Sequence, residues 1–249
     1  MLSDRPFTKE NLDQYLKELA KEFRKRNGKS VPAEIILIGG ASVVINYGFR
    51  EMTYDMDALI NAASSMKDAI NTVGDRNGLP NGWLNDDFRK TESYTDRIIQ
   101  YSNYYRTFYG VLNVRTVTGE YLVAMKLRSG REYKYDRSDV IGILWEQKKF
   151  GNPLTMERIK KAVEELYGSY DVIADEVRLF VEKAIQDGNY GELYTSVRKE
   201  GAENKDNLLE YQEEKPGVIN SDNANDIIAA LRRRKEDKTG LDRTNLQEA

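Results

Sequence analysis

The sequence predicts an α+β protein in which a small sheet is flanked by helices and followed by a helical C-terminal region. Three strand-like segments are found at 35–38, 54–60 and 111–117, and the first is an apolar run rich in β-branched residues, which is typical of a buried strand. Between and after these segments, apolar residues recur at helical spacing. Because both patterns occur in one chain of 249 residues, the sequence can bury a real core.

The clearest boundary in the chain is Gly151-Asn152-Pro153, since glycine and proline interrupt regular structure. We therefore expect a main domain over 1–150, a helical hairpin region over 151–200, and a charged helical or flexible tail over 201–249.

Composition excludes several classes of function. The chain has no cysteine and no histidine, which excludes disulfides, thiol nucleophiles, Ser-His-Asp hydrolysis and ordinary zinc sites. Any metal must be held by oxygen ligands, which selects Mg²⁺, Mn²⁺ or Ca²⁺. The net charge of -3 gives no global basic field for nucleic acid, and no apolar run approaches membrane-spanning length. A soluble cytoplasmic protein without a membrane partner is the expectation.

Two helices are predicted around the first strands. Residues 7–27 form an amphipathic pattern with Thr8 as N-cap. A second helix is expected over 64–73, ended by Gly74 and the turn-rich segment that follows it.

The stretch 34–60 holds the strongest candidate site. A buried strand stops at Gly39-Gly40, and the apolar positions from Ala41 to Tyr47 then recur at helical spacing. A glycine-rich turn that opens a helix presents free N–H groups, which suit a phosphate.

Two carboxylates follow on the next strand. Asp55 and Asp57 are spaced i and i+2, which places both on one face of a strand. Near a phosphate-sized turn, they make a site for Mg²⁺ bound together with a nucleotide.

These features together, with Arg50 and Thr53 between the turn and the aspartates, resemble the signature of the nucleotidyltransferase superfamily with a polymerase-β-like palm. More narrowly, the order is similar to the abortive-infection nucleotidyltransferases of the AbiEii type, which include toxins of type IV toxin–antitoxin systems. The resemblance covers roughly 35–145 and implies a small mixed or antiparallel palm sheet with flanking helices. It implies binding of an NTP with Mg²⁺ or Mn²⁺, and the residues it assigns to the nucleotide are Gly39, Gly40, Ser42, Arg50, Thr53 and Arg131.

The segment 119–145 adds to this resemblance. Residues 119–131 are predicted to form a helix similar to the family's "LxAxKLxAxR" helix, with Lys126 and Arg131 at its basic positions. Asp136 and Asp139 match the "DxxDh" element that follows. Lys126 could neutralise a triphosphate as a catalytic residue, Lys126 and Arg131 could pair with the two aspartates and tie two helices together, or both roles could hold at once. We expect Asp139 to orient a partner and not to ligate a metal.

The third carboxylate of catalytic members is missing from its expected strand. Such enzymes usually place an acid facing the aspartate pair, completing a two-metal site. The strand 111–117 offers Asn113, Arg115 and Thr116 instead. Asparagine can ligate through its carbonyl oxygen but brings no charge, so the site could bind one metal, or the fold could have lost catalysis.

Other polar groups are weaker candidates. Asn85 and Asp86 lie in a loop that often packs near the site in the resembling family, although a polar turn capping a helix accounts for them more simply. The tyrosine cluster at 101–109 could stack on a base, but tyrosine also fits a half-buried sheet surface, which we favour.

Beyond the boundary, helices are predicted at 155–167, 171–186 and 224–235. The segment after Gly188 shows short apolar patches only, and 239–249 is expected to be disordered. The basic run at 232–235 could touch RNA phosphates, but positive charge at a helix end is the simpler interpretation.

Three functions follow from these patterns. The first is an enzyme that moves an NMP from an NTP to an acceptor, which the resemblance implies could be a tRNA 3′ end or a protein hydroxyl, restrained by an antitoxin. The second is a non-catalytic module that binds a nucleotide or a partner on the same fold. The third, a purely structural domain, leaves the joint match of the glycine turn, the two aspartates and the Lys126 helix unexplained.

Overall fold

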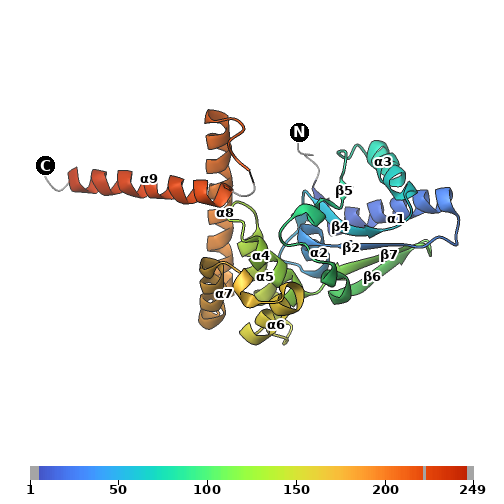
Figure 1. Ribbon diagram of the computed structural model, residues 1–249, viewed down its shortest axis with the longest axis horizontal. Helices are drawn as coiled ribbons and strands as arrows, with labels where there is room; N and C mark the ends of the chain where they lie inside the picture. Colours follow the sequence, from blue (N-terminus) through green and yellow to red (C-terminus); the bar gives the residue numbers. More distant parts are fainter. Residues whose placement is uncertain (1–5, 221–222, 246–249) are drawn as a thin grey trace.

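The computed structural model describes residues 6–220 and 223–245 and confirms the α+β class. A five-stranded sheet lies on one side of the molecule and a group of helices on the other, with the last helix extending away as an arm (Figure 1). The helices of the main part are α1 (Lys9–Asn27), α2 (Gly39–Asn46), α3 (Ser65–Asn77), α4 (Gly119–Ser129) and α5 (Asp136–Lys149), with 3-10 turns η1 (Asp87–Lys90) and η2 (Asp96–Tyr101).

The sheet is mixed, with the order β5-β4-β2-β7-β6. The central strand β2 pairs antiparallel with β4 and parallel with β7, while β6 is antiparallel to β7 and β5 parallel to β4. A two-residue antiparallel pair, β1 with β3, lies beside it. The strands are β1 (Phe7–Thr8), β2 (Ala33–Leu37), β3 (Met52–Thr53), β4 (Met56–Asn61), β5 (Leu84–Asn85), β6 (Ser102–Phe108) and β7 (Leu112–Val117).

The alternation of side chains along β2 explains why its sequence is a continuous apolar run. Ile35 and Leu37 belong to a core shared with α1 and α3, which cover one face of the sheet. Ile36 and Ile38 belong to a second core shared with α4, α5 and the helices that follow. A strand covered on both faces has no polar side to expose.

Helix α1 begins as the sequence predicts, because the Thr8 side chain accepts from the Asn11 N–H in a capping box. Helix α3 differs from the prediction, since it runs through Gly74 to Asn77 and ends at Gly78 in the left-handed conformation. The Trp83 ring packs directly on Gly74, where a Cβ would lie 3.0 Å from the ring. Gly74 is therefore a packing residue inside the helix and does not end it.

The C-terminal region is more helical than the sequence indicates. Helix α7 begins four residues later than expected, because the Ser169 side chain holds the 3-10 turn η3 before it. The segment after Gly188 forms α8, a helix of 25 residues, instead of short patches. Helix α9 continues to Asn245, so 239–245 is helical, and 246–249 lie outside the described residues. The elements are α6 (Met156–Tyr167), η3 (Tyr170–Val172), α7 (Asp175–Asp187), α8 (Tyr190–Glu214) and α9 (Ala224–Asn245).

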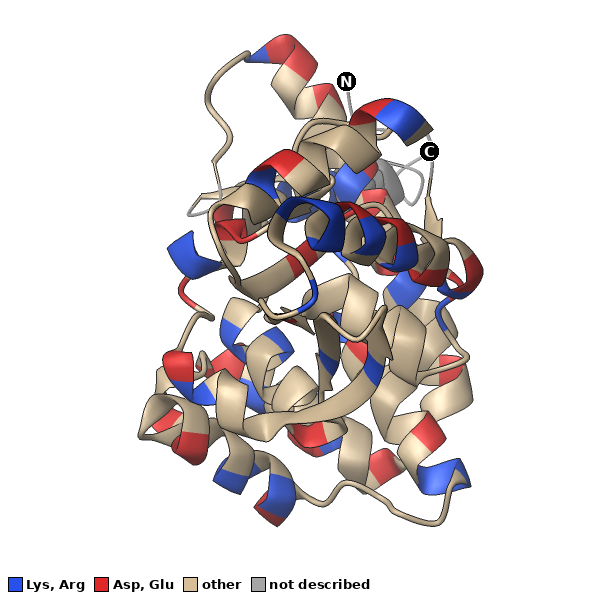
Figure 2. Ribbon diagram, turned by 90° about the vertical axis from the view of Figure 1, so that its right-hand side faces the viewer, with Lys and Arg blue, Asp and Glu red and all other residues tan. Residues whose placement is uncertain are grey.

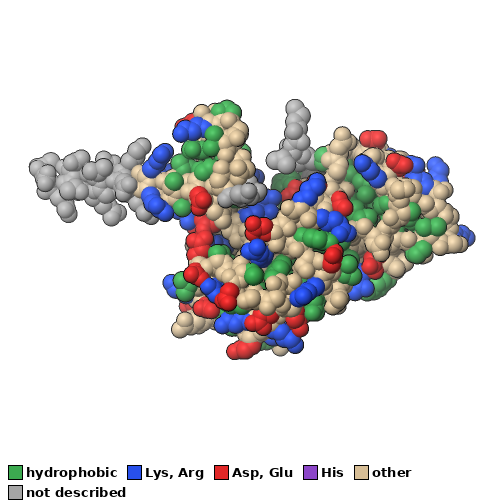
Figure 3. Space-filling view, viewed as in Figure 1, with side chains coloured by type: hydrophobic (Ala, Val, Ile, Leu, Met, Phe, Trp, Pro, Cys, Tyr) green, Lys and Arg blue, Asp and Glu red, His purple; other side chains and the backbone are tan. Residues whose placement is uncertain are grey.

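Acidic and basic residues are interspersed along the chain (Figure 2). Figure 3 shows a notch between the upper part of α8 and the lobe that holds the sheet. No helix in the described part of the chain is long and apolar enough to cross a membrane.

Candidate active site

The turn formed by Gly39 and Gly40 after β2 lies directly beside β4, the strand that carries Asp57. Helix α2 begins at Gly39, and Ile38 before it supplies no side-chain cap, so the first N–H groups of the helix stay available. Gly39 has a φ of +55°, and a Cβ there would lie 3.8 Å from Oδ2 of Asp57. At Gly40 a Cβ would lie 2.3 Å from Oγ1 of Thr53, so only glycine fits this approach.

Asp57 lies at the start of β4, where its carbonyl oxygen accepts from the Ile38 N–H at 3.0 Å. Asp55 precedes the strand and is exposed. Neither carboxylate has an ion-pair partner within 4.0 Å among the residues described. Burial, and then repulsion from the Asp55 carboxylate, raise the pKa of Asp57 above its ordinary value. Two unpaired carboxylates therefore lie close enough to interact.

Positive charge lies beside Asp57. A pocket beside Asp57 is lined by Gly39, Lys126 and Arg131, with Phe88 among the apolar side chains that complete it. Lys134 is exposed nearby. Its pKa is lowered by desolvation and by Arg131, whereas the carboxylates of Asp55 and Asp57 act in the opposite direction. Positive charge from Arg131 and Lys134 therefore lies close to the two acids.

Lys134 was not a candidate from the sequence. It lies three residues after Arg131, in the short loop that joins α4 to α5. The sequence could have indicated Lys134 only by its position between Arg131 of the predicted helix and Asp136 of the aspartate-containing element that follows.

Lys126 is part of a buried ion-pair network. Its ammonium lies 2.7 Å from Oδ1 of Asp136 and 2.8 Å from Oδ2 of Asp139, and only 8 % of the residue is exposed. Arg131 also pairs with Asp136, at 2.8 Å, and Arg50 pairs with Asp139 at 2.6 Å. The alternative in which these residues tie two helices together is thus the observed arrangement. The network has three cations and two anions, so its net charge is positive next to the pocket.

The polar atoms of three further candidates contact protein groups and not the pocket. Ser42 is fully buried, and its hydroxyl accepts from the Val117 N–H at 3.1 Å. Arg50 donates from Nε to the Met52 carbonyl and from Nη2 to Thr53, whose hydroxyl donates to the Asp55 carbonyl. These side chains shape the turn that carries Asp55.

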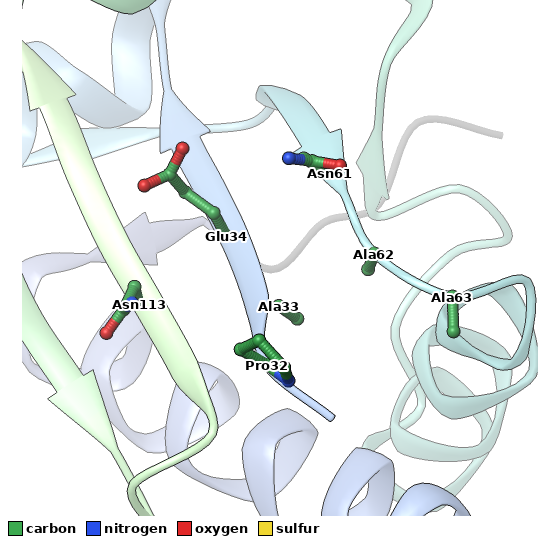
Figure 4. A pocket seen from close by; sticks show the side chains of 7 residues that line it. All are labelled: Pro32, Ala33, Glu34, Asn61, Ala62, Ala63 and Asn113. Atoms are coloured by element: carbon green, nitrogen blue, oxygen red, sulfur yellow. The ribbon is translucent and has the colours of Figure 1, made fainter. Parts of the chain in front are cut away.

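Asn113 lies at the other end of the sheet. It pairs with Glu34 on β2, which pairs with Asn61 on β4, and these residues line a separate hollow (Figure 4). Asn61 is four residues along β4 from Asp57, about 13 Å at the usual strand rise. The structure therefore does not bring Asn113 to the aspartates.

The position across the sheet from Asp57 belongs to an apolar residue. Asp57 lies beside Ile38, and the register of β2 with β7 puts Val117 next in the same row. Val117 is fully buried. The third acid of a two-metal site is therefore not on this row.

Asn85 and Asp86 follow the neighbouring strand β5. Asn85 pairs with Asp57 in the sheet, but its side chain is used locally, donating to the Gly82 carbonyl and accepting from the Asp87 N–H. The Asp86 carboxylate is 3.6 Å from Arg89 on the surface. Both side chains belong to the polar turn before η1.

The donor set of the site fits one hard cation. Within residues 6–220 and 223–245, no group of three or more carboxylates could hold a metal by itself. Mg²⁺ needs no such group, because it is commonly bound by one or two carboxylates plus substrate phosphates and water. Asp55 and Asp57 would supply the carboxylates, and phosphates on the glycine turn would complete the shell.

A family model described as nucleotidyltransferase of unknown function (DUF6036) matches residues 14–181. The chain belongs to this nucleotidyltransferase family. The match covers more than half of the chain and includes the glycine turn, both aspartates and the loop with Arg131 and Lys134. No curated protein and no solved structure matches the chain. The match ends inside α7, so α8 and α9 lie beyond the part that defines the nucleotidyltransferase family.

Proposed function

We propose that the chain transfers a nucleoside monophosphate from an NTP to an acceptor hydroxyl, with a single Mg²⁺ or Mn²⁺ held by Asp55 and Asp57. The observation that carries this proposal is that both carboxylates are free of ion pairs among the residues described, although Lys126 and Arg131 line the same pocket as Asp57. A carboxylate with only a structural role in such surroundings would pair with one of these cations, as Asp136 does. Membership of the nucleotidyltransferase family supports the same chemistry.

The triphosphate would lie between the glycine turn and the α4–α5 loop. The first N–H groups of α2 would donate to phosphate oxygens, because a helix N-terminus favours negative charge. Arg131 and Lys134 would face the same phosphates, with the buried cation Lys126 behind them.

The transfer itself forms one bond and breaks one. The acceptor oxygen bonds to the α-phosphorus, the bond from that phosphorus to the bridging oxygen breaks, and pyrophosphate leaves with the electron pair. The hydroxyl proton passes to solvent. A cation held by Asp55 and Asp57 would stabilise the negative charge that develops on the leaving pyrophosphate. Arg131 and Lys134 add fixed positive charge to the same region.

A non-catalytic, nucleotide-binding role is the second candidate, and one specific observation favours it. Val117 occupies the row where a facing acid would lie, so the described part of the chain offers only two carboxylates to a metal. Binding would then persist while transfer is lost.

The proposal also concerns the acceptor that receives the nucleoside monophosphate. The resemblance to AbiEii-type toxins supports a tRNA 3′ end or a protein hydroxyl, with an antitoxin as the restraining partner. Both acceptor classes are therefore included in the test.

The experiment incubates the protein with each α-labelled NTP, Mg²⁺ or Mn²⁺, and either total tRNA or the protein alone. The variant is Asp57→Asn, and the matched control is Asp68→Asn, an exposed aspartate on α3 at the opposite face of the sheet. We expect label on one acceptor with the wild type and the control, and none with Asp57→Asn. Nucleotide binding without transfer by the wild type would instead establish the binding module, and neither binding nor transfer would refute both.

A further inference from the structure

The loop that joins α4 to α5, residues 130–135, is held by the two helices that lie beyond the family match. Asn225 of α9 donates to the Gly130 carbonyl at 2.9 Å and accepts from the Glu132 N–H at 3.1 Å. Asn204 of α8 donates to the Glu132 carbonyl at 3.0 Å. Two asparagines, one from each helix, therefore bind the backbone of a short loop that is otherwise irregular.

The side chain of Glu132 is held as firmly as its backbone. Its carboxylate lies 2.6 Å from Arg137 of α5 and 2.9 Å from Arg232 of α9. Glu200 of α8 also contacts Arg232. Every polar group of Glu132 thus has a partner, and only 9 % of the residue is exposed.

Packing supports the same contact. Tyr133 packs on a small apolar cluster formed by Leu208 of α8 with Ala224 and Ile228 of α9. Helix α8 passes the loop at Gly201, where a Cβ would lie 3.3 Å from the Lys134 carbonyl oxygen. The absence of a side chain at this position allows the helix to approach the loop backbone.

The two basic residues near the site, Arg131 and Lys134, are sequence neighbours of the two loop residues that α8 and α9 contact, Glu132 and Tyr133. Arg131 precedes Glu132, and Lys134 follows Tyr133. The charges of Arg131 and Lys134 both act to lower the pKa of Asp57, and the Asp55 carboxylate in turn acts to raise that of Lys134. Because Lys134 makes no ion pair among the described residues, its position at the site depends on the loop backbone.

We propose that α8 and α9 form a clamp that positions the α4–α5 loop, so that Arg131 and Lys134 face the phosphates of the nucleotide. Asn204 and Asn225 are the positioning residues of this clamp, since they bind the loop backbone and do not touch the pocket. This inference rests on the proposed function. It assigns to the helices beyond the family core a role in affinity for the triphosphate.

The first test measures the loop itself, in the full-length chain. The variants are Asn204→Ala and the milder Asn225→Ala, whose side chain is less buried. The matched control is Asn207→Ala, on α8 but in contact with Lys235 and not with the loop. We expect faster amide hydrogen exchange of residues 131–135 in both variants and wild-type exchange in the control. Unchanged exchange in both variants would overturn the clamp.

The second test measures binding of ATP, CTP, GTP and UTP with Mg²⁺. For any NTP that the wild type binds, we expect Kd to rise by about tenfold in Asn225→Ala, the effect of misplacing one charged hydrogen-bond donor. In an Arg131→Ala/Lys134→Ala background, Asn225→Ala should add no further loss. A clamp with only a structural role would change the melting temperature but leave the Kd of the folded protein unchanged, which contradicts the proposal.

The two tests separate this inference from the proposed function. A wild-type protein that binds none of the four NTPs refutes the proposed function, and the inference with it. If the wild type binds an NTP and the folded variants Asn225→Ala and Asn204→Ala bind it with the same Kd, the inference is refuted and the proposed function is not.

Discussion

Nη1 of Arg50 lies 2.6 Å from Oδ2 of Asp139, and both side chains are buried. Arg50 belongs to the turn before Asp55, whereas Asp139 belongs to the first turn of α5. This ion pair therefore joins the aspartate side of the pocket to the helical side. Oδ1 of Asp139 has no hydrogen-bond partner among the residues described, so the negative charge of this aspartate is compensated by Arg50 and Lys126.

Replacing Arg50 by methionine removes the cation and leaves a buried carboxylate with a single partner. Breaking a buried pair in this way is expected to lower the free energy of unfolding by roughly 3–5 kcal/mol. Urea unfolding followed by circular dichroism measures the loss. In the double variant with Asp139→Asn, the second substitution should recover part of it. Losses that simply add within about 0.5 kcal/mol would show that the two residues are not coupled.

Stability should fall as the pH drops below about 4, because of Asp136. Burial opposes ionisation of this carboxyl, but Lys126 and Arg131 outweigh it and hold the pKa of Asp136 well below its usual range. A carboxyl with a depressed folded pKa stabilises the protein above its unfolded pKa, and this contribution is lost as the pH falls toward the folded one. Urea midpoints from pH 6 to pH 2.5 measure the slope. Asp136→Asn should flatten it, and an equal slope in that variant would assign the effect elsewhere.

Two helical glycines should respond in opposite ways to alanine. At Gly142 of α5 a Cβ would lie 2.4 Å from the Phe49 ring, so Gly142→Ala overpacks the core and should cost about 1–3 kcal/mol. At Gly191 of α8 the nearest atom is 3.5 Å away, on Trp145, which is ordinary contact. Gly191→Ala should therefore leave the melting temperature unchanged or raise it, because alanine favours helix by about 1 kcal/mol. A stable Gly142→Ala protein would mean that the Phe49 ring moves aside freely.

The sequence predicts the sheet and the early helices from short-range patterns. The strand β2 is recognisable because burial on both faces leaves only apolar residues, and α1 because Thr8 caps it. Helix α8 was missed because its buried face is narrow, with Tyr190, Val197, Asn204 and Leu208 spaced seven, seven and four residues apart. Such a stripe forms isolated patches in any short window.

The candidate site, like the fold, has one part that local sequence patterns predict and one part that they do not. Gly39, Asp55 and Asp57 are close together because a turn and two adjacent strands bring them there, which their local order predicts. The location of Lys134 depends on α8 and α9, which begin more than 50 residues later in the sequence, so no local pattern predicts it. Ser42 follows the two glycines as the sequence pattern requires, but its hydroxyl binds the Val117 backbone of β7, a long-range contact that no local pattern predicts.

Lys126 and Lys134 should separate stability from nucleotide binding. Lys126 is buried between Asp136 and Asp139, so Lys126→Met leaves two carboxylates without their shared cation and should lower the free energy of unfolding by roughly 3–5 kcal/mol. Lys134 is exposed, so Lys134→Met should leave the urea midpoint near the wild-type value. Its charge interacts with the carboxylates of Asp55 and Asp57, so the same substitution should raise the Kd of an NTP by about tenfold, more at low salt than at high salt. Equilibrium binding at two salt concentrations, together with urea unfolding, measures both effects. A Lys134→Met protein that binds the NTP as the wild type does would remove Lys134 from the site, whatever Lys126→Met shows.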